Sequence, residues 1–182
     1  MSLTKKEIIT IIEWNHNRCP RVFVETGTFL GNTILNIHQL FDKIYTVEAS
    51  EKSYNLSKKN CNKIPHAHFY HADSAKWLPE IIKKNNEPAL FFLDAHFFLY
   101  PKQQHLISRK NKMPLMEELK TIKSRKYNDL VVIDDYKWLG RAGAGVNWQH
   151  CSGEDILKLM QPTRHIVWKD YLIFPTISVS LL

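Results

Sequence analysis

The chain is 182 residues long, with 44% hydrophobic and 24% charged residues, which is typical of one globular domain and excludes a chain disordered throughout. Its formal charge of +7 is local: residues 96–126 hold eight basic residues against two acidic ones, which weakens a general nucleic-acid interpretation. Three cysteines without a CxxC pair argue against a zinc knuckle and a disulfide framework and indicate a reducing, cytoplasmic location. We expect neither a signal peptide nor a membrane span.

Apolar runs of strand length alternate along the chain with amphipathic stretches of helix length. Residues 1–20 predict an N-terminal capping helix that begins at Thr4. Strands are predicted at residues 21–25, 43–48, 67–71, 89–94 and 130–134. Helices are predicted at residues 31–41, from Ser50, from Asp73 or Ser74, at 114–123 and, after a Gly-rich loop at 140–145, near 154–160. Residues 165–168 and 171–174 flank Lys169-Asp170 and predict a final hairpin.

Strands separated by helices predict a parallel sheet, and the final hairpin adds one antiparallel strand. We therefore expect a single α/β domain over residues 1–182, a Rossmann-like three-layer sandwich. In such a sheet, ligands bind at the carboxyl ends of the strands. The residues expected at those ends are all acidic: Glu25, Glu48, Asp73, Asp94, Asp134 and Asp135.

The first loop of the predicted sheet contains two glycines that suit a nucleoside-type cofactor. Gly27 allows a tight turn and a close approach of a ligand to the backbone, and Gly31 allows the following helix to pack near the strand. Glu48 follows Gly27 at about the spacing that brings an acid to a ribose hydroxyl. The alternative is an ordinary strand-to-helix turn. A dinucleotide loop needs glycine where Phe29 stands, and the Glu25 carboxylate would repel a pyrophosphate, so S-adenosylmethionine suits the loop better.

These segments resemble the motifs of class I S-adenosylmethionine-dependent methyltransferases, in the form found in small-molecule O-methyltransferases of the catechol or sugar type. Residues 25–33 look like the first motif, Glu48 like the ribose-binding acid, residues 71–74 like the adenine motif and residues 92–96 like the strand-four motif. The resemblance implies a seven-stranded sheet whose last hairpin is antiparallel. It also implies this set of cofactor-binding residues: Glu25, Thr26, Gly27, Thr28, Gly31, Thr33, Glu48, Ala49, Asp73, Ser74 and Asp94.

The acids after the fourth and fifth strands form a second group. Asp94, Asp134 and Asp135 match the places at which catechol-type and sugar-type O-methyltransferases hold a divalent metal, and carboxylate oxygens suit Mg²⁺. A bound metal would orient an acceptor hydroxyl and lower its pKa. The alternative is that Asp94 contacts only cofactor or acceptor, while Asp134 and Asp135 cap a loop.

Three residues are candidates for catalysis: Asp94, His96 and, more weakly, Lys137. His96 could act as a general base or could be a loop histidine without a role. The basic segment 96–112 is either a rim loop that meets an anionic acceptor or a solvated loop. Trp138 and Trp148 either stack on an acceptor or pack under their loop. His66, His68 and His71 are interpreted as a solvated strand face, because no acid or cysteine completes a metal set.

Three functions remain open on the sequence. The first is methyl transfer from S-adenosylmethionine to a hydroxyl of a small acceptor, anionic or sugar-type, with or without Mg²⁺. The second is an RNA or DNA methyltransferase or binder that uses the basic segment. The third is a catalytically inactive cofactor-binding module that acts on a partner. The expected partner is a small molecule, no membrane is expected, and a homodimer that covers the rim loops stays open.

Overall fold

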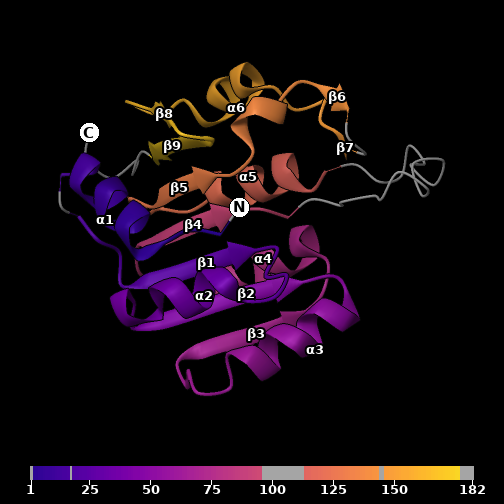
Figure 1. Cartoon of the computed structure of the whole chain (residues 1–182). Coiled ribbons are helices and arrows are strands. Elements are labelled where there is room, and N and C mark those ends of the chain that lie inside the picture. The colour runs from indigo at the N-terminus through magenta and orange to yellow at the C-terminus, as the bar shows by residue number, and fades with distance from the viewer. Residues whose placement is uncertain (1, 17, 96–112, 144–145, 177–182) are drawn as a thin grey trace.

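The computed structural model describes residues 2–16, 18–95, 113–143 and 146–176. Within these ranges the main sheet has seven strands in the order β3-β2-β1-β4-β5-β9-β8 (Figure 1). The parallel strands are β1 (Val22–Thr26), β2 (Lys43–Glu48), β3 (Ala67–His71), β4 (Ala89–Leu93) and β5 (Leu130–Ile133). β9 (Tyr171–Pro175) runs antiparallel to both β5 and β8 (Ile166–Trp168). The predicted mostly parallel sheet with a C-terminal hairpin is confirmed.

Helices cover both faces of this sheet because its strands are apolar on both faces (Figure 1). Alternate side chains of β1 point to opposite faces: Val24 packs in the cluster that includes residues of α4, α5 and α6, and Phe23 packs in the cluster of α1 and α2. The helices are α1 (Lys5–Trp14), α2 (Asn32–Ile37), α3 (Glu51–Asn60), α4 (Ser74–Lys84), α5 (Leu115–Lys123) and α6 (Gly153–Met160). No helix in the described ranges is long and apolar enough to cross a membrane.

Short polar side chains determine where the helices begin. Thr4 and Glu7 form a capping box at the start of α1, and the side chains of Ser50 and Asp73 accept hydrogen bonds from backbone N–H groups at the starts of α3 and α4. These starts agree with the sequence-based prediction. The Asp73 cap fixes the turn that follows β3 at the carboxyl edge of the sheet.

Two segments differ from the prediction. The helix predicted at residues 31–41 ends at Ile37 and continues as a short 3-10 turn, η1 (His38–Leu40), after which the Phe41 ring packs 5.0 Å from the Phe23 ring. The loop predicted at 140–145 contains a small antiparallel ribbon, β6 (Ala142–Gly143) and β7 (Val146–Asn147). Backbone hydrogen bonds between Arg141 and Trp148 and between Gly140 and Trp148 close the base of this ribbon. The basic segment 96–112 and His96 lie outside the described residues.

Candidate active site

The loop after β1 is held by backbone contacts that only glycine permits. Gly27 has φ of +87°, and a Cβ atom there would lie 2.4 Å from the carbonyl oxygen of Asp94. The N–H groups of Gly27 and Thr28 both donate to the carbonyl oxygen of Val47, at 3.0 and 3.2 Å. The loop is therefore fixed between the end of β2 and the end of β4. Gly27 serves a close approach of backbone to backbone, which the sequence did not reveal.

Gly31 and Phe29 complete this loop. Gly31 has φ of +82° immediately before α2, and a Cβ atom there would lie 2.7 Å from Sγ of Cys61 at the end of α3. Gly31 was expected to let α2 pack near the strand, but the neighbour that a side chain here would meet is α3. Phe29 adopts φ of +50°, which is uncommon for a residue with a side chain, and its side chain is 63% exposed.

Glu48, at the end of β2, has both carboxylate oxygens fixed by backbone donors. Phe29 N–H donates to Oε2 and Ser50 N–H donates to Oε1, each at 2.8 Å. The side chain is half-buried, so the remaining lone pairs can accept hydrogen bonds from a ligand. Two acceptor oxygens on one rigid carboxylate match the two adjacent hydroxyls of a ribose.

Glu25 lies beneath the loop with 1% exposure. Its Oε2 accepts a hydrogen bond from Oγ1 of Thr46 at 2.6 Å, and Thr46 in turn contacts the hydroxyl of Thr28 at 2.5 Å. Burial, together with the nearby carboxylates of Asp94 and Glu48, raises the pKa of Glu25 to about 8 even though hydrogen bonds from the hydroxyls of Thr46 and Thr33 oppose this rise. In the absence of a cation, Glu25 is therefore a largely neutral acid at pH 7, and its hydrogen bonds stabilise the loop from below.

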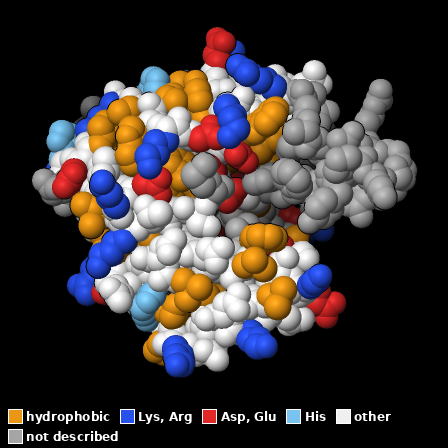
Figure 2. Space-filling model, viewed as in Figure 1, with side chains coloured by type: hydrophobic (Ala, Val, Ile, Leu, Met, Phe, Trp, Pro, Cys, Tyr) orange, Lys and Arg blue, Asp and Glu red, His pale blue; other side chains and the backbone are white. Residues whose placement is uncertain are grey.

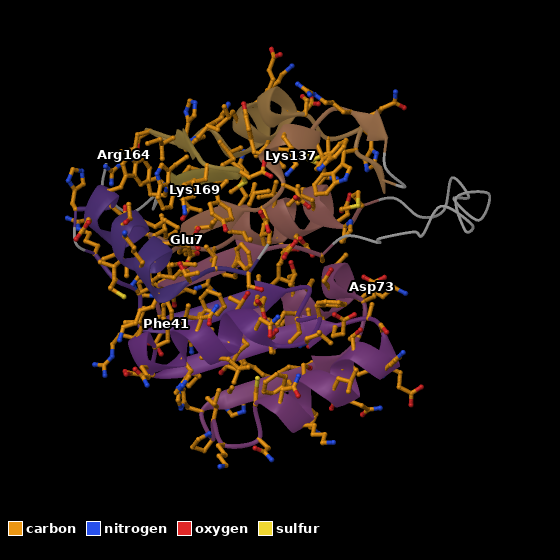
Figure 3. All side chains as sticks on the ribbon, viewed as in Figure 1. Glu7, Phe41, Asp73, Lys137, Arg164 and Lys169 are labelled. Atoms are coloured by element: carbon orange, nitrogen blue, oxygen red, sulfur yellow. The ribbon has the colours of Figure 1, made fainter. Side chains whose placement is uncertain are left out.

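The turn after β3 lies at the same carboxyl edge of the sheet. The Asp73 side chain caps α4 by accepting a hydrogen bond from Ala75 N–H at 3.0 Å, and Ser74 is buried. The carbonyl of Ala49 contacts Nε2 of His71 at 3.1 Å, and the His71 ring stacks on Tyr54 at 5.4 Å. Figure 3 shows Asp73 near the carboxyl edge of the sheet, on the side opposite α1.

Asp94 and Asp134 follow the neighbouring strands β4 and β5. Burial and the Asp94 carboxylate raise the pKa of Asp134 well above its ordinary value. Asp135 has φ of +56°, and its N–H donates to Oδ1 of Asp134 at 2.8 Å. In the part of the chain that the structure describes, His, Cys, Asp and Glu side chains do not form a metal-binding group of three or more. Asp94 and Asp134 are thus close enough for their charges to interact, although Asp134 is buried. On the surface, Figure 2 shows acidic side chains next to Lys and Arg side chains just above the middle of the viewed face.

Lys137 lies in η3 (Tyr136–Trp138), three residues after Asp134, in the upper part of Figure 3. Its N–H donates to Oδ1 of Asp170 at 2.9 Å, and its ammonium group forms an ion pair with the same carboxylate. Asp170 and the more distant Asp134 and Asp135 raise the pKa of Lys137. Lys137 is therefore a fixed cation, and proton removal by Lys137 would first require the loss of this ion pair. Trp148 is 3% exposed in the core, which favours the packing interpretation of that side chain.

Solved structures share the fold of this chain, although no family model matches the sequence and no curated protein is detectably similar to it in sequence. An O-methyltransferase from Bacillus cereus, solved with S-adenosylhomocysteine, aligns with a TM-score of 0.60 over 97% of this chain and 82% of its own, at 15% identity. The O-methyltransferase TomG from Streptomyces achromogenes, solved with S-adenosylmethionine, gives a TM-score of 0.60 over the same shares at 14% identity. The N-methyltransferase NodS from Bradyrhizobium japonicum gives 0.57 over 94% and 95%, at 9% identity.

The chain has the class I methyltransferase fold. The expected resemblance is confirmed at the level of the fold. Because fold neighbours include both O- and N-methyltransferases, the fold alone does not select the acceptor atom. In this fold, the Gly27 loop, Glu48, the Asp73-Ser74 turn and Asp94 lie at one carboxyl edge, as predicted.

The sequence did not single out three polar residues that are buried or make long-range contacts in the structure: Thr46, Asp170 and Glu118. Thr46 is a polar residue inside the buried part of β2, and its side chain lies on the same face of the sheet as that of Glu25. The alternation of side chains along a strand could have predicted this shared face. Asp170 was assigned only to a hairpin turn, and its contact with Lys137 spans 33 residues. Glu118 was counted only as a charge, yet it is 1% exposed. Asp170 has no local pattern that identifies its contact, whereas Glu118 stands on the apolar face of α5 with Leu115, Leu119 and Ile122, so helical periodicity contained a signal for its burial.

Proposed function

We propose that this protein transfers a methyl group from S-adenosylmethionine to a hydroxyl of a small acceptor, with Mg²⁺ held at Asp94 and Asp134. The observation that carries the proposal is the rigid pairing of the Gly27 loop with Glu48 at the carboxyl edge. S-adenosylmethionine, when bound, supplies the methyl group by in-line displacement at its methyl carbon. The main task of the site residues is then to position two reactants.

The cofactor would be held by the residues that the sequence singled out. Glu48 would accept hydrogen bonds from the ribose hydroxyls, because both its oxygens are already oriented by backbone N–H groups. The Asp73-Ser74 turn would border the adenine. Glu25 would act below the loop: a cationic ligand above it favours its ionised form, so we expect its pKa to fall when the cofactor binds.

The pair Asp94–Asp134 fits a hard cation because two nearby carboxylates repel each other unless a cation or a proton separates them. Mg²⁺ is commonly held by one or two carboxylates, with water and substrate oxygens as its remaining ligands. It would orient the acceptor hydroxyl and lower its pKa. Asp135 would serve mainly by fixing Asp134 through its N–H. His96 stays the predicted base and lies outside the described residues.

Lys137, whose side chain is 56% exposed, is a cation near the acid pair, and it would favour an acceptor that carries negative charge or several hydroxyls. The three cysteines are free in the structure, which supports our proposal of a cytoplasmic location. The nucleic-acid alternative rests on the segment 96–112 and gains nothing from the described residues.

Calorimetric titration tests the cofactor part of the proposal. We expect S-adenosylmethionine and S-adenosylhomocysteine to bind the wild-type protein. Glu48→Gln should weaken this binding about tenfold or more, because a hydrogen bond to a charged group contributes about 1.5–3 kcal/mol. Glu51→Gln, an exposed acid at the start of α3, is the matched control and should bind as the wild type does. No binding of either ligand to the wild type, with or without Mg²⁺, would overturn the proposal.

A further inference from the structure

Three consecutive residues of β2 hold the loop that follows β1. Glu48 accepts a hydrogen bond from the N–H of Phe29, and the carbonyl oxygen of Val47 accepts one from the N–H of Thr28. The third residue, Thr46, contacts the hydroxyl of Thr28 through its own hydroxyl, with 2.5 Å between the two oxygens. Thr46 has no role in the proposed function, and its polar side chain inside a buried strand needs a physical reason.

Thr46 lies between the loop and the buried acid beneath it. It is the direct neighbour of Glu25 in the parallel pairing of β1 with β2, so the two side chains share one face of the sheet. Its Oγ1 donates to Oε2 of Glu25 at 2.6 Å. Thr46 is fully buried and Thr28 is 4% exposed, so water does not compete for these bonds. A hydrogen-bond chain therefore runs from Glu25 through Thr46 to Thr28.

This chain keeps both of its bonds whether or not Glu25 carries a proton on Oε2. A hydroxyl group donates one hydrogen bond and accepts others. When Oε2 is unprotonated, Thr46 donates to Glu25, so Thr28 must donate to Thr46. When Oε2 carries the proton, both bonds reverse: Glu25 donates to Thr46, and Thr46 donates to Thr28. A change of charge beneath the loop therefore does not require the loop to move.

We propose that Thr46 is a positioning residue of the cofactor site: its hydroxyl holds Thr28, and with it the Gly27 loop, on the Glu25 carboxyl. The inference rests on the proposed function and adds to it a residue that touches neither the cofactor nor the reacting atoms. The proposed cofactor is a cation that would favour the ionised form of Glu25. A joint made of hydroxyls stays intact through that change.

Thr28 transmits the contact to the rest of the loop. Its carbonyl oxygen accepts a hydrogen bond from the N–H of Gly31 at 2.9 Å, which closes the turn before α2. The next residue, Phe29, provides the N–H that orients the Glu48 carboxylate. A loosened Thr28 should therefore disturb the carboxylate that is proposed to bind the ribose.

Calorimetric titration of S-adenosylhomocysteine tests the inference without turnover. Thr46→Val keeps the shape of the side chain and removes its hydroxyl, so we expect it to bind this ligand about fivefold more weakly, the effect of one neutral hydrogen bond. Thr46→Ser keeps the hydroxyl and should recover most of the affinity. A residue that only filled space in the core would be replaced better by valine than by serine.

Thr176→Val is the matched control. The Thr176 hydroxyl also joins two partners: it accepts from the N–H of Asp129 and donates to the carbonyl oxygen of Tyr127, each at 2.9 Å. These partners lie at the opposite edge of the sheet, where β5 begins. Thr176→Val should therefore lower the melting temperature and leave the affinity for the ligand unchanged.

A double-mutant cycle shows whether Thr46 acts through Thr28. Thr28→Val breaks the chain at the loop and should weaken binding at least as much as Thr46→Val. With either hydroxyl removed, the bond between the two residues is already lost, so the effects on the free energy of binding should not add in the double variant.

Thermal unfolding identifies the variants that are folded. The inference is overturned if a folded Thr46→Val binds as tightly as the wild type, if Thr46→Ser binds as weakly as Thr46→Val, or if Thr176→Val weakens binding as much. Full additivity in the cycle also overturns it. If Thr46→Val does not fold, a folded Thr28→Val with wild-type affinity is sufficient to overturn it. If the wild type itself does not bind the ligand, the proposed function fails, and the inference fails with it.

Discussion

Gly27 is the residue whose identity the structure constrains most tightly. An alanine there would adopt φ of +87° and place Cβ 2.4 Å from the Asp94 carbonyl oxygen. The left-handed region costs a residue with a Cβ about 1–2 kcal/mol, and the backbone contact adds to that cost. We expect Gly27→Ala to destabilise the protein by more than this amount and to weaken S-adenosylhomocysteine binding at least tenfold, as measured by urea unfolding and calorimetry.

Gly140→Ala is the control for Gly27→Ala, because it introduces backbone strain at a glycine outside the candidate cofactor site. Gly140 has φ of +76°, and a Cβ atom added there would lie 3.1 Å from its nearest neighbour, Cβ of Ser152. This variant should lose about 1–2 kcal/mol of stability from the backbone conformation and keep the wild-type affinity for the ligand. Equal effects of the two substitutions on binding would mean that the Gly27 loop acts only through overall stability.

The pair Asp94–Asp134 leads to a second prediction about a single residue. Asp134→Asn removes one negative charge beside Asp94, so Mg²⁺ should bind at least tenfold more weakly, while S-adenosylhomocysteine affinity measured without metal should change little. Glu80→Gln, an exposed acid in α4, is the control and should leave both affinities unchanged. The assignment fails if the wild type shows no calorimetric signal for Mg²⁺, or if Asp134→Asn binds the metal as well as the wild type.

At the scale of elements, the β8–β9 hairpin fixes α1 against the sheet. The ammonium group of Lys169, in the hairpin turn, donates to Oε1 of Glu7 in α1 at 2.7 Å, and Figure 3 shows the two side chains close together. The other oxygen of Glu7 accepts from the N–H and hydroxyl of Thr4. At the far end of α1, Arg164 donates to the Trp14 carbonyl oxygen at 3.1 Å.

Lys169→Met should therefore destabilise the protein by about 1–2 kcal/mol in urea unfolding, because it leaves the buried Glu7 carboxylate without its cation. Lys83→Met breaks a pair whose side chains are 69% and 61% exposed, and it should cost less than about 0.5 kcal/mol. Adding Glu7→Gln to Lys169→Met should restore part of the loss. Full additivity of the two substitutions would show that the ion pair does not couple α1 to the hairpin.

The elements were predictable from the sequence where the signal is local. The buried strands contain continuous apolar runs, and Thr4, Ser50 and Asp73 mark helix starts, so these boundaries agree within a residue or two. The ribbon β6–β7 was not predictable because its two-residue strands depend on hydrogen bonds at the ribbon base rather than on a pattern. The depth of Glu25 was also not predictable, because the covering contacts come from β2 and α2.

At the scale of the whole molecule, buried acids control how stability depends on pH. Burial raises the pKa of Glu25 to about 8 and that of Glu118 to about 7, whereas an unfolded glutamate loses its proton near 4.5. Between these values the folded state holds protons that the unfolded state has released, so the free energy of unfolding must fall as the pH rises from about 4.5 to 8. Below 4.5 both states are protonated, and above 8 both are ionised, so these two acids add no further slope there.

We therefore expect the melting temperature to be higher at pH 5 than at pH 8.5 in scanning calorimetry without ligand. Glu118→Gln should flatten the slope mainly between pH 4.5 and 7, and Glu25→Gln should flatten it up to pH 8, because an amide does not titrate. The raised pKa of Asp134 contributes to the slope in the same direction, so part of the slope should persist when Glu118→Gln and Glu25→Gln are combined. A melting temperature that rises from pH 5 to 8.5 in the wild type, or a slope that neither substitution alters, would contradict this origin of the pH dependence.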